Sequence, residues 1–441
     1  MARPIRRRRL LQGTLAAAAG ATATSALRGQ APAAKTASTP GEPRPVRIGV
    51  IGTGGRGTGL LGGLLTMKGL DVPAVCDVRP AAAENARNMV LRAGRSACET
   101  YTAGEEDFKR LLDRSDLDGV IIATPWEWHT PMSVYAMKAG KYVGCEVPIA
   151  LTVEECWQLV DTCEQTGVGC MMMENWSFRR DNLAVLNMIR QGLLGEIIHC
   201  HCAHSHNCMH WYFDGRGYPR WSGRHLIRRN CDLYPTHSLG PVLSWMDLNC
   251  GDRIDYVTST ASRCLGIRGQ LLKKYGPNHP PLKEKYLQGD IVTTVARTVK
   301  GNTLVINNDM QTPRPYDNRW EIEGTNGLYN EQRNAVYIHG VSPKHEQWEP
   351  FAPYQEKYDH KWWKEMQASA GGHGGTDYLE LDKFVQAVRA KGPTPISVYD
   401  SVVMSVIFPL SEQSITKGSA PVKCPDFTRG KWEKSKPYFA V

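Results

Sequence analysis

Apolar and polar positions follow two different patterns along the chain, and the change falls near residue 174. From Val46 onward, short apolar runs alternate with segments whose apolar residues recur at the helical period. Strands and helices in this order are typical of βαβ units, which build a parallel, doubly wound sheet. The predicted strands are 46–51, 72–76, 119–123, 142–145 and 169–173, and the predicted helices are 56–67, 81–93, 130–139 and 153–166. We therefore expect an α/β Rossmann domain over residues 46–173.

The pattern after residue 174 is mixed. A tract rich in Trp, Tyr, Arg and Gly lies between Met209 and Asn230, and later apolar runs are separated by turn signals at residues 300–302 and 325–327. Short runs joined by such turns are typical of antiparallel hairpins. The predicted strands are 197–203, 290–299, 303–308, 320–324 and 327–329, and the predicted helices are 179–190, 377–390 and 402–417. We expect an α+β domain with an open, mainly antiparallel sheet over residues 174–441.

A glycine-rich turn follows the first predicted strand. Gly52, Gly54 and Gly57 have the G-x-G-x-x-G spacing of dinucleotide-binding folds. In that motif the first glycine allows a tight turn, the second admits a pyrophosphate, and the third lets helix and strand pack closely. The start of the next helix offers N–H groups and a positive dipole end to phosphates. A glycine-rich turn without a ligand has the same spacing, so it is the βαβ context that indicates a nucleotide site.

An acidic residue ends the second predicted strand. Asp77 follows Gly52 by 25 residues, near the distance of about 20 expected for the carboxylate that binds the cofactor ribose. Its presence favours NAD over NADP, although Arg79 nearby could accommodate a 2′-phosphate. Asp77 could also cap the helix that begins near Pro80, and the two roles are compatible.

The positive charge of the chain is concentrated at its beginning. The formal net charge is +9, and seven basic residues without any acid lie within residues 1–35. The remainder is close to neutral, which argues against a nucleic-acid partner. A basic start, a weakly apolar run over residues 15–27 and small residues after it are typical of a signal peptide. The Arg-Arg-x-Leu-Leu run at residues 7–11 favours the twin-arginine export route, with a disordered basic tail as the alternative.

These features predict where the protein is found. We expect a twin-arginine-type signal peptide over residues 1–35, a linker over residues 36–45, and a periplasmic or otherwise extracytoplasmic protein. No apolar run is long enough to span a bilayer, so no membrane span is expected.

Cysteine and histidine are dense around residue 200. The chain has 13 cysteines, an odd number without a C-x-x-C pair, which fits poorly with a disulfide framework. Cys200, Cys202 and Cys208 lie among five histidines, at positions 199, 201, 204, 206 and 210. Metal binding is possible there, but the alternating spacing favours a half-buried strand that leads into a polar loop. We predict no metal site.

Several short segments resemble a known family. Ala123-Thr124-Pro125 and Glu146-Val147-Pro148, each at a predicted strand end, are similar to the glucose–fructose oxidoreductase and inositol dehydrogenase (Gfo/Idh/MocA) superfamily. Further segments resemble the NAD-dependent family 109 glycoside hydrolases, which are enzymes of α-N-acetylgalactosaminidase type. Those segments are residues 126–129, 174–175, 179–181, 233–237, 314–316 and 409–414. The resemblance covers about residues 46–435.

The resemblance implies roles for the matching positions. Together with the glycines of the turn, the NAD-binding residues would be Gly52, Gly54, Gly55, Arg56, Gly57, Asp77, Trp126, Glu127, Trp128, His129, Glu146, Val147, Asn175 and Tyr234. The substrate-binding residues would be His204, Ser222, Tyr234, Pro235, Thr236, His237 and Tyr316. Packing is the alternative role for Trp126, Trp128 and Tyr316, and a strand-end cap for Glu146.

The chain departs from the family pattern at the sugar site. The family would place an arginine after Trp221, where this chain has Ser222, and a tyrosine where it has His204. Arg220 and Arg224 are candidates to replace the missing guanidinium. Since unpaired buried polar groups are costly, these changes alter which sugar substituents can be bound. N-acetylgalactosaminides are the substrates that the family implies, and the departures put the sugar in doubt more than the mechanism.

The family mechanism implies specific chemistry. NAD takes a hydride from C3 of the sugar, the C2 proton becomes acidic, the C1 substituent is eliminated, water adds, and the hydride returns. A histidine suits the proton transfers, so we assign His237 as general base, with Tyr234 holding a sugar hydroxyl or assisting. A structural histidine capping a helix over 238–248 is the alternative. Val147 stands where the wider superfamily usually has a lysine, which argues against a simple dehydrogenase.

Two other functions stay open from the sequence. One is an exported sugar oxidoreductase that passes hydride between two substrates, and the other is a non-catalytic, NAD-containing sugar-binding protein. Export favours the glycosidase, because an enzyme outside the cytoplasm has little NAD to exchange with and needs a cofactor that recycles in place. By analogy only, the open sheet of the second domain is a surface for a homodimer.

Overall fold

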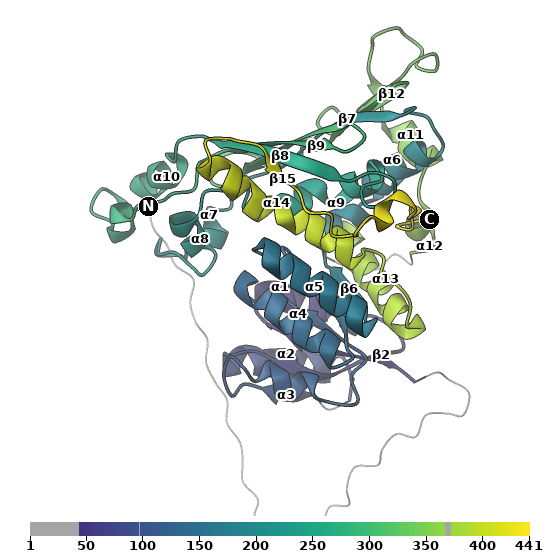
Figure 1. Cartoon of the computed structure of the whole chain (residues 1–441). Helices are drawn as coiled ribbons and strands as arrows, with labels where there is room; N and C mark the ends of the chain where they lie inside the picture. Colours follow the sequence, from purple (N-terminus) through teal and green to yellow (C-terminus); the bar gives the residue numbers. More distant parts are fainter. Residues whose placement is uncertain (1–43, 97, 367–371) are drawn as a thin grey trace, which may run out of the picture. The chain divides into compact units, whose positions relative to one another are not determined.

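The apolar runs of the first half form a six-stranded parallel sheet (Figure 1). In this computed structural model, which describes residues 44–96, 98–366 and 372–441, the strand order is β3-β2-β1-β4-β5-β6. Every neighbouring pair is parallel, as in dinucleotide-binding folds that reverse at the first strand. The strands are β1 (Val46–Ile51), β2 (Leu70–Cys76), β3 (Glu99–Tyr101), β4 (Gly119–Ile122), β5 (Tyr142–Cys145) and β6 (Cys170–Met172).

Helices connect these parallel strands, as the alternating pattern predicts. They are α1 (Gly55–Leu65), α2 (Pro80–Arg92), α3 (Phe108–Leu112), α4 (His129–Lys138) and α5 (Val153–Thr166), with a 3₁₀ turn η1 (Trp126–Trp128). Helix α5 begins at a capping box, in which Thr152 and Glu155 satisfy each other's backbone N–H groups. The predicted α/β Rossmann architecture is confirmed.

The second half is built on a nine-stranded sheet. Its order is β14-β13-β12-β11-β7-β10-β9-β8-β15, and the pairing is antiparallel except between β7 and β10. The strands are β7 (Ile197–Ser205), β8 (Ile254–Ala261), β9 (Val292–Thr298), β10 (Thr303–Asp309), β11 (Glu321–Gly324), β12 (Gly327–Asn330), β13 (Ala335–Ile338), β14 (Glu349–Pro350) and β15 (Val422–Lys423). The predicted mainly antiparallel sheet is confirmed.

Three longer helices join the two halves. Helix α9 (Pro235–Trp245) packs on β7 and β10, and α14 (Val398–Thr416) lies between β8 and α5 (Figure 1). Helix α13 (Thr376–Ala390) returns to pack on α1 and η2. The remaining elements are α6 (Arg180–Arg190), α7 (Met209–Tyr212), α8 (Gly223–Arg228), α10 (Gly266–Tyr275), α11 (Ala352–Lys357), α12 (Lys361–Glu365), η2 (Asn175–Phe178), η3 (Pro280–Lys283), η4 (His373–Gly375) and η5 (Lys431–Glu433).

The start of α9 differs from the sequence prediction. A helix is expected over residues 238–248, but α9 begins at Pro235, whose fixed φ suits the first helical position. His237 therefore lies inside the first turn of α9 instead of preceding the helix. Its side chain is carried by a regular element.

Residues Pro45–Val441 form one unit by their contacts. The predicted signal peptide over residues 1–35 and the linker over 36–45, except for its last two residues, lie outside the described residues. Within the described part of the chain, no helix is both long and apolar enough to cross a bilayer.

Candidate active site

The turn between β1 and α1 has the close approaches that a phosphate loop requires. Gly52 has φ +84°, and a Cβ there would lie 2.5 Å from the carbonyl oxygen of Ala123. A Cβ on Gly57 would lie 1.8 Å from the Gly52 oxygen. In contrast, a Cβ on Gly55 would meet nothing within 4 Å, and one on Gly54 would meet only the Arg79 side chain. The inner side of the loop is therefore closed by backbone and its outer side is accessible.

Asp77 lies beside this loop at the end of β2. Its carboxylate accepts hydrogen bonds from the backbone N–H of Thr53 at 2.9 Å and from Nε of Arg79 at 3.1 Å. Although burial alone would raise its pKa, the Arg79 guanidinium and the backbone donors hold the pKa of Asp77 below its usual value. The group is thus an ionised acceptor at the position where a ribose hydroxyl binds.

Arg56, the second residue of α1, links the loop to two carboxylates. Its Nε donates to Glu146 Oε1 at 2.5 Å, and its Nη1 donates to Asp377 Oδ2 at 2.7 Å. Asp377 also accepts from Asn175 Nδ2 at 2.7 Å and lies 2.9 Å from Nδ1 of His373. Burial opposes the charge on Asp377, but His373 and Arg56 together hold its pKa well below the usual range.

These residues fit a bound dinucleotide. The Gly54–Gly55 side of the loop is accessible to a pyrophosphate, and no side chain caps the N-terminus of α1 within the described residues. The Oδ1 atom of Asn175 is buried and has no hydrogen-bond partner among the described residues, so it is an acceptor for a cofactor hydroxyl or amide. Asp77 offers a carboxylate beside the loop, where a cofactor ribose is expected.

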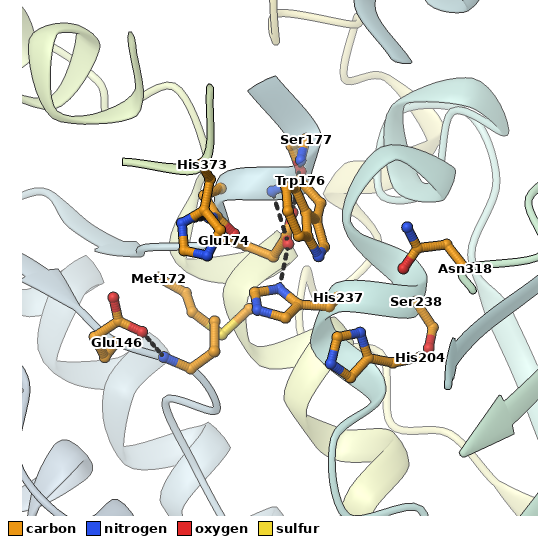
Figure 2. A network of polar contacts seen from close by, with 12 residues as sticks. Glu146, Met172, Glu174, Trp176, Ser177, His204, His237, Ser238, Asn318 and His373 are labelled. Atoms are coloured by element: carbon orange, nitrogen blue, oxygen red, sulfur yellow. Dashed lines mark hydrogen bonds and ion pairs between the residues drawn. The ribbon is translucent and has the colours of Figure 1, made fainter. Parts of the chain in front are cut away.

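His237 is bound through one ring nitrogen. Its Nδ1 lies 2.7 Å from Oε1 of Glu174, a fully buried carboxylate at the end of β6, and Figure 2 shows this contact. The ring lies 5.0 Å from the ring of Tyr234 and 5.1 Å from that of His204. The structure therefore brings together three of the residues that the sequence assigns to the sugar site.

Aromatic rings surround this group. Tyr316, 45% exposed, donates its hydroxyl to Asn318 Oδ1 at 3.0 Å, and its ring centroid lies 5.7 Å from that of His204. The Trp176 ring centroid lies 5.8 Å from that of His237 and 5.3 Å from that of His373. Flat aromatic faces beside polar tips suit a sugar ring, whose C–H faces are apolar.

Burial sets the charge states in this cluster. It lowers the pKa of His204 well below its ordinary value, with smaller contributions from the neighbouring imidazoles of His237 and His206. The same cause lowers the pKa of His206 to about 4. Burial also raises the pKa of Tyr234 well above its ordinary value. Near neutral pH, the two histidines are thus uncharged and Tyr234 keeps its proton.

Some predicted site residues use their polar atoms elsewhere. The His129 ring lies between two backbone oxygens, 2.7 Å from that of Pro148 and 2.8 Å from that of Thr124. Ser222 donates its hydroxyl to the backbone oxygen of Trp211 at 2.7 Å. Ser222 therefore does not supply the donor that the family has after Trp221.

The remaining predicted residues lie around the cluster. Trp126 packs 5.9 Å from Tyr234, whereas Trp128 packs against Phe108 on α3. Glu127 lies 3.3 Å from Nε2 of His225. Three further predicted residues, Val147, Pro235 and Thr236, are buried.

Four residues of the site carry no role in the sequence prediction: Glu174, His206, His373 and Asp377. Glu174 is part of a recognised motif, but its bond to His237 spans 63 residues and needs the fold. His373 has a local signal, because Gly372, Gly374 and Gly375 surround it just before α13. Glycine-rich stretches of that kind often carry function.

The dense cysteine and histidine segment is strand β7 and the loop after it. Cys200 and Cys202 are buried on β7, and all 13 cysteines are free. Across the described ranges, no group of three or more His, Cys, Asp or Glu side chains is arranged to hold a metal ion.

The fold and the phosphate loop define a nicotinamide-dependent class. Residues 46–174 match the family model of the oxidoreductase family with an NAD-binding Rossmann fold. A solved levoglucosan dehydrogenase in complex with NADH and L-sorbose has a TM-score of 0.68 and 21% identity, covering 87% of this chain and all of that one. The first half is accordingly an NAD-binding Rossmann domain, as predicted.

The second half determines the family within that class. Residues 178–434 match the C-terminal domain of glycosyl hydrolase family 109. A family 109 protein of Stenotrophomonas maltophilia is 39% identical over 96% of this chain and 97% of its own. An α-N-acetylgalactosaminidase of Tannerella forsythia is 40% identical over 90% of this chain and 89% of its own. The chain belongs to glycosyl hydrolase family 109.

Proposed function

We propose that this protein is a glycosidase that cleaves sugars by transient oxidation at C3 and elimination at C1. The observation that carries the proposal is the placement of His237 in the first turn of α9, with Tyr234 just before that helix, next to the buried carboxylate that follows β6 of the Rossmann sheet. When bound, NAD supplies a hydride acceptor for C3 and returns the same hydride at the end, so no net redox change results.

His237 is the general base in this proposal. Its Nδ1 is bound to Glu174, which leaves Nε2 as the nitrogen that can accept a proton from the sugar. Tyr234, whose pKa is raised by burial, stays protonated and acts as a hydrogen-bond donor to a sugar hydroxyl. The two residues thus have different roles: His237 moves a proton and Tyr234 holds the substrate.

His373 is a second proton carrier. Elimination at C1 requires a proton for the departing oxygen, and His373 and His237 both pack on the Trp176 ring. Its Nδ1 contacts Asp377 at 2.9 Å, and its side chain is 48% exposed. An exposed imidazole held by a carboxylate can exchange protons with solvent between turnovers.

The substrate is a carbohydrate, and α-N-acetylgalactosaminides are the first candidates because relatives carry that name. The Ser222 hydroxyl is bound to Trp211, and Nε of Arg220 donates to the backbone oxygen of Phe213 at 3.2 Å. With these contacts, neither Ser222 nor Arg220 takes the place of the free guanidinium that the family has after Trp221. We therefore expect a substrate preference that differs from that of these relatives.

One experiment tests the proposed chemistry. The purified protein is analysed for bound cofactor and incubated with aryl glycosides in D₂O, including α- and β-N-acetylgalactosaminides. Release of the phenol with deuterium at sugar C2 supports the glycosidase. Accumulation of NADH or of a reduced co-substrate would instead indicate a sugar oxidoreductase, the reaction class of the levoglucosan dehydrogenase structure. Cofactor without either reaction would indicate a sugar-binding protein.

We also propose export by the twin-arginine route, with NAD that stays tightly bound to the enzyme and is recycled there. The basic start of the chain supports export, and the 13 free cysteines suit a protein that folds in a reducing compartment first. Replacing Arg7 and Arg8 by lysine should keep the enzyme in the cytoplasm, as measured by fractionation. Unchanged periplasmic activity would contradict this route.

A homodimer through the large sheet is a further proposal. Helices α9 and α14 pack on this sheet, and Val295 on its inner strand β9 is 43% exposed. Light scattering coupled to size exclusion measures the mass; a monomer at micromolar concentration would contradict it.

A further inference from the structure

Glu174 is a fully buried carboxylate whose two oxygens both accept hydrogen bonds. Oε1 accepts from the Trp176 backbone N–H at 3.1 Å and contacts His237 Nδ1 at 2.7 Å. Oε2 accepts from the Ser177 backbone N–H at 2.8 Å and from its hydroxyl at 2.6 Å. Figure 2 shows the carboxylate between the η2 turn and the His237 ring. An anion at zero exposure is stable only when its acceptors are filled in this way.

Helix α9 is shaped to admit this carboxylate. A Cβ on Gly240 would lie 1.9 Å from Oε2 of Glu174, so the helix can approach only because residue 240 has no side chain. His237 and Gly240 are three residues apart, on the same face of α9. That face thus gives Glu174 both the space and the ring nitrogen that it contacts.

Capping of η2 does not by itself require the contact with His237. For capping, the Glu174 carboxylate accepts three hydrogen bonds from the turn: one from the Trp176 backbone N–H, and two from the backbone N–H and hydroxyl of Ser177. The fourth contact fixes a ring on another element and determines where its proton lies. Since a carboxylate accepts but does not donate, Nδ1 must carry the hydrogen, and Nε2 keeps its lone pair.

We propose that Glu174 is the positioning residue for His237, fixing the ring and its tautomer so that Nε2 receives the substrate's proton. This inference rests on the proposed function, in which His237 is the base. When Nε2 takes the proton, the ring becomes a cation that faces an anion at hydrogen-bond distance. The proton passes from the sugar to Nε2, while the Nδ1 proton stays where it is.

The other groups around the ring do not supply this charge. His204 faces His237 from β7, and His206 follows that strand and contacts His204; burial lowers both of their pKa values, so they are neutral near pH 7. Tyr234 faces it from the start of α9 and keeps its proton. His373 contacts Asp377, and its ring packs on Trp176. Glu174 is the carboxyl group in direct contact with the ring.

The test compares Glu174→Gln with Ser177→Ala in the full-length, cofactor-loaded protein. Glutamine has one acceptor and one donor, so its amide N–H must face either the η2 donors or Nδ1. The second arrangement puts the proton on Nε2 and removes the base. We expect kcat to fall by about 100-fold or more, within the range of general base catalysis, with KM and NAD content changed less than threefold. The acidic limb of the kcat profile should move to lower pH.

Ser177→Ala is the matched control. It removes one donor to the same carboxylate and leaves the contact with His237 intact. It should keep kcat within about threefold of wild type and leave the acidic limb in place, even if the melting temperature falls. Equal losses of kcat in the two variants, with the acidic limb unmoved in both, would show that Glu174 is only a cap.

Two further measurements separate the possible failures. Glu174→Gln added to His237→Ala should cause no further loss, because residues that act as a unit are not additive; additive losses would overturn the inference. Inactive His237→Ala with fully active Glu174→Gln would overturn the positioning role alone, whereas active His237→Ala would overturn the base assignment as well. If Glu174→Gln does not fold, ¹⁵N-histidine NMR of the wild type decides. An Nδ1-protonated His237 supports the role, and an Nε2-protonated ring contradicts it.

Discussion

At the scale of single residues, the site is defined by which polar atoms are already in use. The polar side-chain atoms of His129 and Ser222 contact backbone oxygens. In contrast, His237 contacts Glu174 through one ring nitrogen, and its other ring nitrogen is left for the substrate. The two histidines of the predicted site, His129 and His237, therefore differ in the chemistry they can perform. A histidine bound on both sides can pack and orient, but it cannot exchange a proton.

Replacing His237 by alanine should lower turnover by about 10²–10⁴-fold while NAD stays bound. General base catalysis contributes about 10²–10⁴-fold to the rate, and the phosphate loop lies on a separate element. Steady-state kinetics and the absorbance of released cofactor measure the two properties. Full activity in this variant would refute the base assignment.

Gly54→Val should yield a folded protein without cofactor. A side chain there meets only the mobile end of Arg79, at 3.2 Å, but it occupies the side of the loop that a pyrophosphate must approach. NAD retained at the wild-type ratio would show that the phosphate loop is misplaced. Gly57→Val is the contrasting variant: its Cβ would clash with backbone at 1.8 Å, so we expect loss of folded protein.

Acidification should destabilise the protein partly through His206. Burial, with smaller contributions from the nearby imidazoles of His237 and His210, lowers its pKa to about 4, against about 6.5 in an unfolded chain. Between these values the unfolded state binds a proton that the folded state does not, so stability falls as pH drops from about 6.5 to 4. His206→Gln should show a smaller difference in unfolding free energy between pH 7 and pH 5, measured with urea. An unchanged difference would contradict this assignment.

At the scale of elements, regular patterns were predictable and long-range partners were not. The βαβ alternation predicts the parallel sheet because strand and helix periods are written in local sequence. The sequence predicts that helix α9 begins at residue 238, three residues after its actual first residue, Pro235. Strand β8 and helix α10 were missed, since their apolar positions become clear only against α14 and η3.

The candidate site shows the same division. The glycines, Asp77 and the Tyr234–His237 segment lie in short motifs, and the structure places them at the site. The contacts of Glu174 with His237, and of Arg56 with Asp377, join residues far apart in sequence. No periodicity encodes such pairs, because only the packed elements bring them together.

Gly240→Ala tests the packing of α9 on η2. The new methyl would lie 1.9 Å from a carboxylate oxygen, so α9 or Glu174 must shift. Overpacking of this kind costs about 1–3 kcal/mol. We expect a lower unfolding free energy in urea and reduced kcat together. Gly269→Ala is the control on exposed helix α10, where a Cβ meets nothing within 4 Å, and its stability should not fall.

At the scale of the whole molecule, the cofactor half is completed by a late segment. Helix α13 packs on α1, and Asp377 at its start binds Arg56 of the phosphate loop and Asn175. The contacts of Arg56 beside the phosphate loop are therefore completed by a residue more than 300 positions after the first strand of the Rossmann sheet.

Asp377→Asn should weaken both stability and cofactor retention. It removes the charge that Arg56 and His373 face, and a hydrogen bond to a charged group is worth about 2 kcal/mol. Urea unfolding and the NAD content after dialysis measure the two effects. The contribution of Asp377 is present above the usual Asp pKa and is lost as pH falls through its lowered value, so the variants should converge in strong acid. Wild-type NAD content would contradict the coupling.

The return of α13 to the phosphate loop sets an order of events during synthesis. Arg56 leaves the ribosome early, but its partner Asp377 is translated 321 residues later. Until almost the entire polypeptide has emerged, the Rossmann segment therefore lacks the contact between Arg56 and Asp377. We therefore expect tight cofactor binding only after the chain is complete, when Asp377 has reached Arg56.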